Sequence, residues 1–253
     1  MRPVKEKQPQ VPLARMALRS LTLQGSWNYL TMLGGGFAFA ILPALLRLHG
    51  HDPAALQSAL RRHSEHFNAH PYLSGVALGA VARMEASRVD PEHIRRFKTA
   101  VRGPLGGLGD TLVWAGGLPA LLLVALALVR LGAPAWVAIV VFLGCYNAGH
   151  AALRIWGFRV GFRSGAAVGS HLRQVDLPAW GGRFQAAAVT LLGAVLVALF
   201  VAEGPLSTVA PWWVVPAGAL FVTGALRGRE LWRPAGVAFA FAIAGLFALG
   251  AVS

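Results

Sequence analysis

Long apolar segments after residue 110 constrain this chain more than any other feature of its sequence. Five of them follow one another, over residues 112–130, 134–153, 184–202, 211–226 and 234–252. A helix needs about 17 to 25 mostly apolar residues to cross a hydrocarbon core about 30 Å thick, so the short fourth segment must tilt, thin the bilayer or re-enter. The sequence therefore predicts an all-α, polytopic integral membrane protein with about five transmembrane helices.

The composition supports this class and excludes others. Hydrophobic residues make up 56% of the 253 residues and charged residues 13%, against about 45–50% and about 25% in soluble domains. The net charge of +13 comes from basic residues that lie between apolar segments without interleaved aromatics, which indicates topological anchors and not nucleic-acid binding. The single cysteine, Cys145, allows no intrachain disulfide, and the eight histidines lack metal-binding spacing. We expect no metal and no cofactor.

The positions of the arginines predict the orientation in the membrane. Residues 154–183 contain five arginines and residues 227–233 contain three, whereas residues 203–210 contain none. Connections rich in Lys and Arg stay in the cytoplasm. We therefore expect both Arg-rich connections and the N-terminus to be cytoplasmic, and the C-terminus to be external.

Three regions are expected along the chain. Residues 1–22 form a cytoplasmic arm, disordered to about residue 12, residues 23–111 form a region of amphipathic and re-entrant helices, and residues 112–253 form the transmembrane bundle. Within the middle region, residues 54–66 and 72–86 have helical periodicity. Residues 23–48 are apolar but interrupted by Gly and Pro, which is typical of helices that start and stop inside a protein-lined cavity.

Polar side chains in the middle region are the candidates for function, because lipid surroundings penalise polar groups that line no cavity and contact no other subunit. We expect a substrate pathway formed by Asn28, Asn68, His70, Glu85 and Asp110. In the FNAHP segment, Pro71 disfavours a helical conformation at His70 and leaves amide and imidazole groups available to sugar hydroxyls. A turn in which Asn68 only caps helix ends is the alternative.

Asn28 and Glu85 have structural alternatives as well. Asn28 stands between Trp27 and Tyr29 in the GSWNY segment, and such aromatic residues are typical of a membrane interface. Glu85 can contact a ligand, or it can form an ion pair with Arg88 three residues further on.

The glycine-rich segment RGPLGGLGDT lies directly before the first predicted span. Asp110 is suited to cap the N-terminus of that helix. Capping does not explain Gly106, Gly107 and Gly109, which indicate a close backbone approach or a hinge. No lysine follows in the position that a phosphate-binding P-loop requires, which excludes nucleotide hydrolysis.

Several segments, taken in order, resemble the membrane-embedded IID component of the mannose/fructose/sorbose family of sugar phosphotransferase systems. They are LQGSWNY, FAILPALLRL, RRHSEHFNAHPYLSGVALGAVARMEA, RGPLGGLGDTLVW and WGFRVGFRSG. The resemblance is strong over residues 23–110 and holds in order through Gly165. Members of that family usually read FFNT where this chain has residues 66–69, and methionine where it has Arg102.

The resemblance implies a function and partners. It implies a permease subunit of the bacterial inner membrane that forms a hexose pathway with a homologous IIC subunit, while cytoplasmic IIA and IIB phosphocarriers phosphorylate the sugar. The subunit itself carries no phosphohistidine and is not an enzyme alone. Its arginine clusters are suited to anionic membrane lipids or to an acidic IIB face.

Two other functions fit part of the sequence. A scaffold or regulatory subunit of an incomplete phosphotransferase system would keep the partners without moving sugar. An unrelated multispan transporter would account for the apolar segments but not for the ordered motifs.

Overall fold

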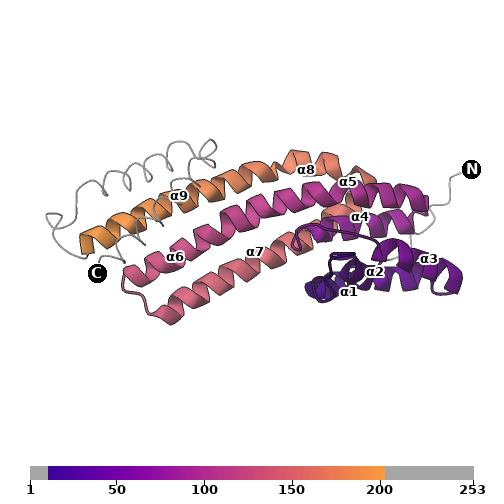
Figure 1. Ribbon diagram of the computed structural model, residues 1–253, viewed down its shortest axis with the longest axis horizontal. Coiled ribbons are helices and arrows are strands. Elements are labelled where there is room, and N and C mark those ends of the chain that lie inside the picture. The colour runs from indigo at the N-terminus through magenta and orange to yellow at the C-terminus, as the bar shows by residue number, and fades with distance from the viewer. Residues whose placement is uncertain (1–10, 203–253) are drawn as a thin grey trace, which may run out of the picture. The chain divides into compact units, whose positions relative to one another are not determined.

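The computed structural model describes residues 11–202, with side chains to residue 196, and every regular element in this part of the chain is helical. The elements, in order, are α1 (Leu13–Arg19), η1 (Ser20–Thr22), α2 (Gly34–His49), α3 (Pro53–Ser64), α4 (Ser74–Ala86), α5 (Pro91–Gly109), η2 (Asp110–Gly117), α6 (Leu118–Arg130), α7 (Ala135–Ser164), η3 (Gly165–Ala167), α8 (Val168–Val175) and α9 (Leu177–Ala202) (Figure 1). The all-α prediction is confirmed at this level. The start of the predicted N-terminal arm, residues 1–10, lies outside the described residues.

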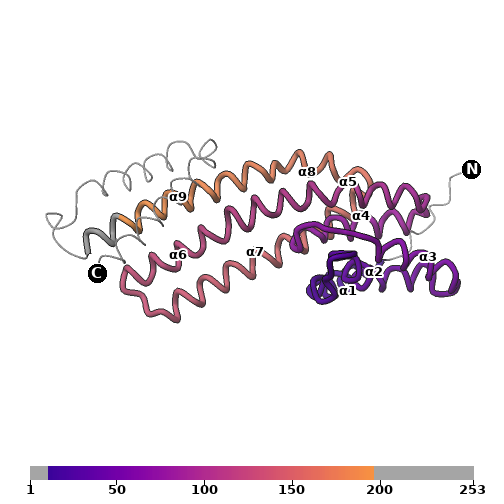
Figure 2. Tube along the Cα trace, viewed as in Figure 1, coloured from indigo at the N-terminus to yellow at the C-terminus, as the bar shows by residue number. Residues whose placement is uncertain are grey.

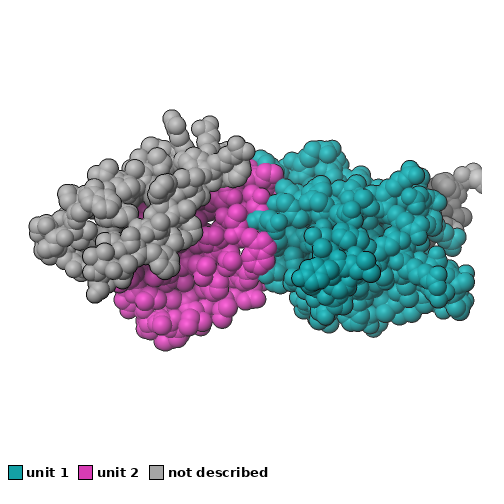
Figure 3. Space-filling model, viewed as in Figure 1, with its two compact units in different colours: residues 1–110, 149–176 teal, residues 111–148, 177–253 magenta. Residues whose placement is uncertain are grey.

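The described chain forms two compact units (Figure 3). Unit 1 contains residues 11–110 and 149–176, and unit 2 contains residues 111–148 and 177–202. The second half of α7 thus belongs with the N-terminal helices. The three-region division expected from the sequence stays a prediction.

Two helices of unit 1 begin at Asp-Pro pairs. Asp52 accepts a hydrogen bond from the Ala55 amide at 3.0 Å, and Pro53 occupies the first turn of α3. Asp90 accepts from the amides of Glu92 and His93, ahead of α5. An aspartate cap satisfies amides that have no partner within the helix, and proline suits the first turn because it has no amide hydrogen to leave unpaired.

Helix α2 provides the apolar centre of unit 1. Phe37, Ile41 and Leu45 are fully buried and four residues apart, so they lie on one face of the helix. The helix packs against α1, α3 and α4. The interruption expected in this segment is absent at Pro43, because α2 runs unbroken from Gly34 to His49.

A close helix crossing joins α4 to the second half of α7. Gly75 and Gly79 on α4 approach Gly157 and Gly161 on α7. A Cβ atom at Gly79 would lie 2.8 Å from the Phe162 amide nitrogen, and one at Gly161 would lie 2.8 Å from the Ala80 amide nitrogen. Small residues four apart on both helices let the two backbones pack directly, as they do between membrane helices.

The predicted spans are present in part. Two helical runs, Pro91–Arg130 and Ala135–Val175, are long and apolar enough to cross a membrane. They are joined by a turn in which Gly132 adopts a positive φ of 90°. The third predicted span falls within α9, which packs along α6 in unit 2, while the fourth and fifth lie outside the described residues. The count of five spans therefore stays a prediction.

The glycine crossing predicts a specific cost for added side chains. Gly161→Ala should destabilise the protein by about 1–3 kcal/mol, because the new methyl group meets backbone atoms of α4. Gly169→Ala on α8 is the matched control, since nothing lies within 4 Å of a Cβ there. Both variants gain similar helix propensity. Thermal unfolding of the full chain in detergent measures the difference, and equal stability of the two variants would contradict the crossing.

Candidate functional site

Backbone hydrogen bonds join the residues that follow the GSWNY segment to the FNAHP segment in unit 1. The Leu33 amide donates to the Phe67 carbonyl at 2.9 Å, and the Phe67 amide donates to the Thr31 carbonyl at 3.2 Å. The Phe67 ring is buried and lies 4.6 Å from the Phe37 ring, centroid to centroid. Two motifs that are about 40 residues apart in sequence therefore form one loop pair.

The FNAHP segment also packs on the glycine face of α5. A Cβ atom at Gly109 would overlap the His70 ring, with 2.7 Å to Nδ1, and one at Gly106 would lie 4.0 Å from the Ala69 Cα. A Cβ atom added at Gly107 would have no other atom within 4 Å. Gly106 and Gly109 are one turn apart, so their missing side chains leave room for the turn that carries His70. All three motifs meet here, and the meeting place of residues 28–33, 67–70 and 106–110 is called the motif junction below.

Asp110 is not the N-cap of a helix. Its backbone angles are helical (φ −60°, ψ −44°), and its amide donates to the carbonyls of Gly106 and Gly107. The chain continues from α5 through the π-helical η2 into α6 without a break (Figure 2). The N-cap prediction is therefore wrong, because the glycines continue the helix instead of ending it. Widened π turns often occur at functional sites.

A line of polar and aromatic side chains extends from His70. The rings of His70 and Tyr72 lie edge to face at 5.0 Å, and Tyr72 stacks on His150 at 3.7 Å between centroids. His150 Nε2 lies 2.9 Å from an Arg154 guanidinium nitrogen. Arg154 is buried and donates to the carbonyl and hydroxyl oxygens of Ser20. Burial lowers the pKa of His70 to about 4, with Asp110 opposing the shift and His150 adding to it.

Glu85 lies in a separate buried cluster in unit 1. Its Oε1 accepts from Arg62 at 2.6 Å and from His63 at 2.8 Å, and its Oε2 lies 3.2 Å from His49 Nε2. The partners come from α2 and α3, so the expected pair with Arg88 is wrong. Lys98 donates to the Arg62 carbonyl at 2.7 Å and ties α5 to the cluster.

Hydrogen bonding and charge set the protonation of this cluster. Burial alone raises the pKa of the Glu85 carboxyl, but the hydrogen bond from His63 and the charge of Arg62 outweigh burial and lower it to about 2. Complete burial lowers the pKa of His63 to about 4. At neutral pH an ionised Glu85 thus accepts from a charged Arg62 and a neutral His63. A buried charge held by this many donors is a structural element of the helix packing.

The remaining predicted residues are exposed. Asn28 forms a closed local turn: its side-chain oxygen accepts from the amides of Leu30 and Thr31, and its Nδ2 donates to the Ser26 carbonyl and the Thr31 hydroxyl. Asn68 is exposed, and Leu73 rather than Asn68 is the N-cap residue of α4, so the capping alternative is wrong. Asp110 is exposed as well. Asn28, Asn68, His70 and Asp110 belong to the motif junction, and Glu85 does not.

Sequence reasoning missed Tyr72, His150 and Arg154. The spacing of four residues between His150 and Arg154 on one helix was an available signal. Nothing local indicated that Tyr72 would stack on a residue 78 positions later. Within residues 11–202 no group of three or more His, Cys, Asp or Glu is arranged to hold a metal ion.

Comparison with known proteins identifies the family. Residues 10–208 match the family described as the PTS system mannose/fructose/sorbose family IID component. The chain belongs to this family. Both the match and the apolar helices make it a membrane protein.

The alignments with individual relatives cover only part of this chain and part of each relative. The mannose-specific EIID component of Escherichia coli K12 is 30% identical over 165 residues, which are 63% of this chain and 58% of that protein. The sorbose-specific EIID component of Klebsiella pneumoniae is 32% identical over 175 residues, 66% of this chain and 62% of that protein. The chain thus aligns with less than two thirds of the length of these relatives.

Solved structures share the fold. A chain in the cryo-EM structure of the mannose transporter ManYZ with microcin E492 matches 93% of this chain and 95% of its own length, with a TM-score of 0.58 at 22% identity. A second solved structure, described as that of a membrane protein, matches 96% of this chain and 98% of its own length, with a TM-score of 0.68 at 22% identity.

Two departures from the usual IID pattern contact each other. Arg102 donates to His66 Nδ1 at 2.8 Å and to the His66 carbonyl at 3.3 Å. A polar contact therefore joins α5 to the residue directly before the FNAHP segment.

The buried cluster predicts acid sensitivity. Because the folded pKa of His63 is about 4 and its ordinary value is 6.5, the unfolded chain binds more protons between these values, and stability falls as pH falls through this window. Glu85 extends the loss to lower pH with the same sign. His63→Gln should reduce the loss by up to about 1.4 kcal/mol per pH unit. Unfolding at several pH values tests this, with His93→Gln on the exposed start of α5 as the control; identical pH profiles for both variants would contradict it.

The packing of His70 predicts a difference between neighbouring glycines. Gly109→Ala should displace the His70 ring and destabilise the protein by about 1–3 kcal/mol. Gly107→Ala, two residues away in the same helix, should be neutral or slightly stabilising. Unfolding in detergent measures both, and an equally tolerated Gly109→Ala would show that His70 does not pack on α5.

Proposed function

We propose that this chain is the IID subunit of a phosphoenolpyruvate-dependent sugar phosphotransferase permease. With a IIC subunit it forms the pathway for hexose uptake, and IIA and IIB phosphocarriers phosphorylate the sugar as it is delivered. The chain supplies no catalytic residue itself. We further propose that the chain crosses the bacterial inner membrane about five times, with its N-terminus in the cytoplasm and its C-terminus outside.

The motif junction is the observation that carries the proposal. Asn68 and Asp110 flank the buried His70 and are exposed on this chain, so a partner subunit can cover them. Amide and carboxylate groups suit sugar hydroxyls, which both donate and accept hydrogen bonds. The junction lies where α5 passes into the π-helical η2, and irregular helices are typical of transporter sites.

The names of the relatives agree with this class. Proteins named for mannose, sorbose and fructose match the chain, which supports a hexose substrate. Glu85 is removed from the proposed pathway, because its carboxylate is occupied by Arg62 and His63. No observation favours the scaffold alternative.

Sugar uptake tests the proposal. Cells that co-express the chain with its IIC, IIA and IIB partners should accumulate radiolabelled mannose, fructose or sorbose. Asn68→Ala should reduce uptake about tenfold or more, the effect of losing a hydrogen bond of about 1.4 kcal/mol in the transport transition state. His70→Ala should also reduce uptake, because the buried His70 ring packs the FNAHP turn that carries Asn68 onto α5. His93→Ala, on an exposed histidine with a side chain 70% accessible, should retain full uptake.

Complex assembly separates the possible outcomes. Co-purification of the IIC subunit shows whether each variant is folded and assembled. An assembled wild-type complex that takes up none of the three sugars would favour the scaffold. Normal uptake by both Asn68→Ala and His70→Ala would remove these residues from the pathway.

A further inference from the structure

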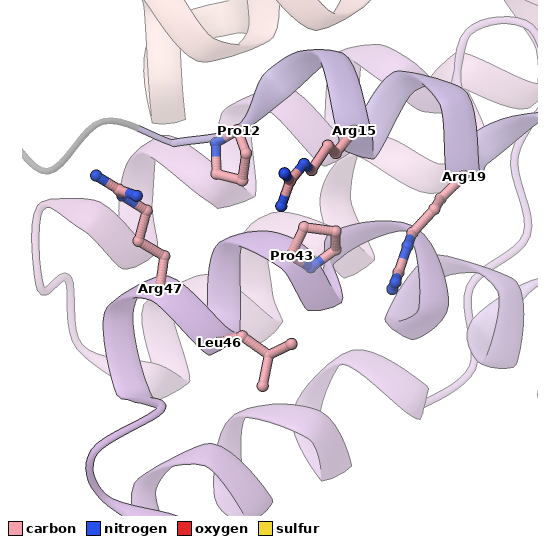
Figure 4. A pocket seen from close by; sticks show the side chains of 6 residues that line it. All are labelled: Pro12, Arg15, Arg19, Pro43, Leu46 and Arg47. Atoms are coloured by element: carbon pink, nitrogen blue, oxygen red, sulfur yellow. The ribbon is translucent and has the colours of Figure 1, made fainter.

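A pocket between α1 and α2 has no role in the function proposed above. It has a volume of about 570 Å³. Its lining residues are Pro12, Arg15, Arg19, Pro43, Leu46 and Arg47 (Figure 4). The pocket belongs to unit 1, and none of its residues takes part in the motif junction or in the Glu85 cluster.

The charge of the pocket is uncompensated within the described residues. Three of its six lining residues are arginines, and no ion pair in residues 11–202 involves them. Arg15 and Arg19 are one turn apart on α1 and extend toward α2, which contributes Pro43 to the lining (Figure 4). Three positive charges around one pocket, with no carboxylate in its lining, repel one another, so an anion bound in the pocket is stabilised.

One of the three arginines, Arg19, is partly ordered by contacts with Phe39. The Arg19 guanidinium lies 4.7 Å above the centre of the Phe39 ring and 3.4 Å from the Phe39 carbonyl oxygen. Pro12, directly before α1, and Pro43, within α2, restrict the backbone on the two helices that line the pocket. A partly ordered arginine loses less freedom on binding, and its planar fork matches the oxygens of a phosphate group.

Exposed apolar side chains lie on the same two helices and on η1, which directly follows α1. Leu18 and Leu21 are 68% and 59% accessible, and Leu46 and Phe39 are 48% and 45% accessible. Arginines beside exposed leucines on a short helix are typical of segments that lie at the membrane interface. A soluble anion would use only the arginines, whereas a phospholipid also covers the apolar side chains.

We propose that this pocket binds the phosphate headgroup of an anionic phospholipid from the surrounding membrane. Arg15, Arg19 and Arg47 contact the phosphate, while the acyl chains lie against Leu18, Leu21 and Leu46. Clusters of arginines at the membrane surface attract anionic lipids in this way. The lipid would hold α1 and the end of α2 at the bilayer surface.

Native mass spectrometry of the full chain released from detergent tests the proposal, with phosphatidylglycerol and phosphatidylcholine as probes. The wild type should retain phosphatidylglycerol in preference to phosphatidylcholine. Each substitution among Arg15→Gln, Arg19→Gln and Arg47→Gln should weaken phosphatidylglycerol retention about fivefold. The triple variant Arg61→Gln/Arg88→Gln/Arg96→Gln removes the same charge from exposed positions elsewhere and should keep the preference.

Four results on lipid retention would overturn the proposal. They are equal retention of both lipids by the wild type, an unchanged preference in the triple pocket variant Arg15→Gln/Arg19→Gln/Arg47→Gln, an equal loss in the control variant, and displacement of phosphatidylglycerol by inorganic phosphate. Loss of IIB binding with unchanged lipid retention would assign the pocket to a protein partner and also overturn it. Because Arg47 is exposed, the single variant Arg47→Gln provides the test if the triple variant does not fold.

Discussion

Close backbone approach at glycines is the constraint on which the rest of unit 1 depends. Gly79 and Gly161 let α4 and the second half of α7 cross in direct contact, and Gly109 accepts the His70 ring against α5. Each of these contacts joins segments that are far apart in sequence. Without them the FNAHP segment would have no fixed position relative to α5, and the motif junction would not form.

Burial then divides the polar residues into two groups. Arg62 and His63 Nε2 both hydrogen-bond the Glu85 carboxylate inside the helix packing, where removing one partner of a buried ion pair costs about 3–5 kcal/mol. Asn68 and Asp110 are exposed beside His70. The Glu85 carboxylate is therefore engaged in stabilising the fold, whereas the exposed groups are accessible to a solute or a partner subunit. The chemistry of the proposed pathway therefore belongs to the second group.

Local patterns predicted much of this arrangement. The helical class, the helices near residues 54–66 and 72–86 and the break at FNAHP follow from short-range preferences that act within a few residues. The continuity of α5 through Asp110 was not predictable in the same way, because glycine and proline normally end a helix and the packing of Gly109 against His70 is a contact between segments far apart in sequence. The partners of Glu85 were missed for a related reason, since Arg62 is brought to it by the fold and not by sequence spacing.

Disulfide trapping tests the central claim most directly. A disulfide joins residues whose Cα atoms are usually about 4.4–6.8 Å apart. A Cβ at Gly106 would lie 4.0 Å from the Ala69 Cα, so adding one Cα–Cβ bond of about 1.5 Å places the two Cα atoms at most about 5.5 Å apart. In a Cys145→Ser background, which removes the single native cysteine, Ala69→Cys with Gly106→Cys should cross-link under mild oxidation, as shown by protection from alkylation. Ala69→Cys with Gly107→Cys should not. Equal cross-linking of both pairs, or of neither in folded protein, would contradict the packing of the FNAHP segment on α5.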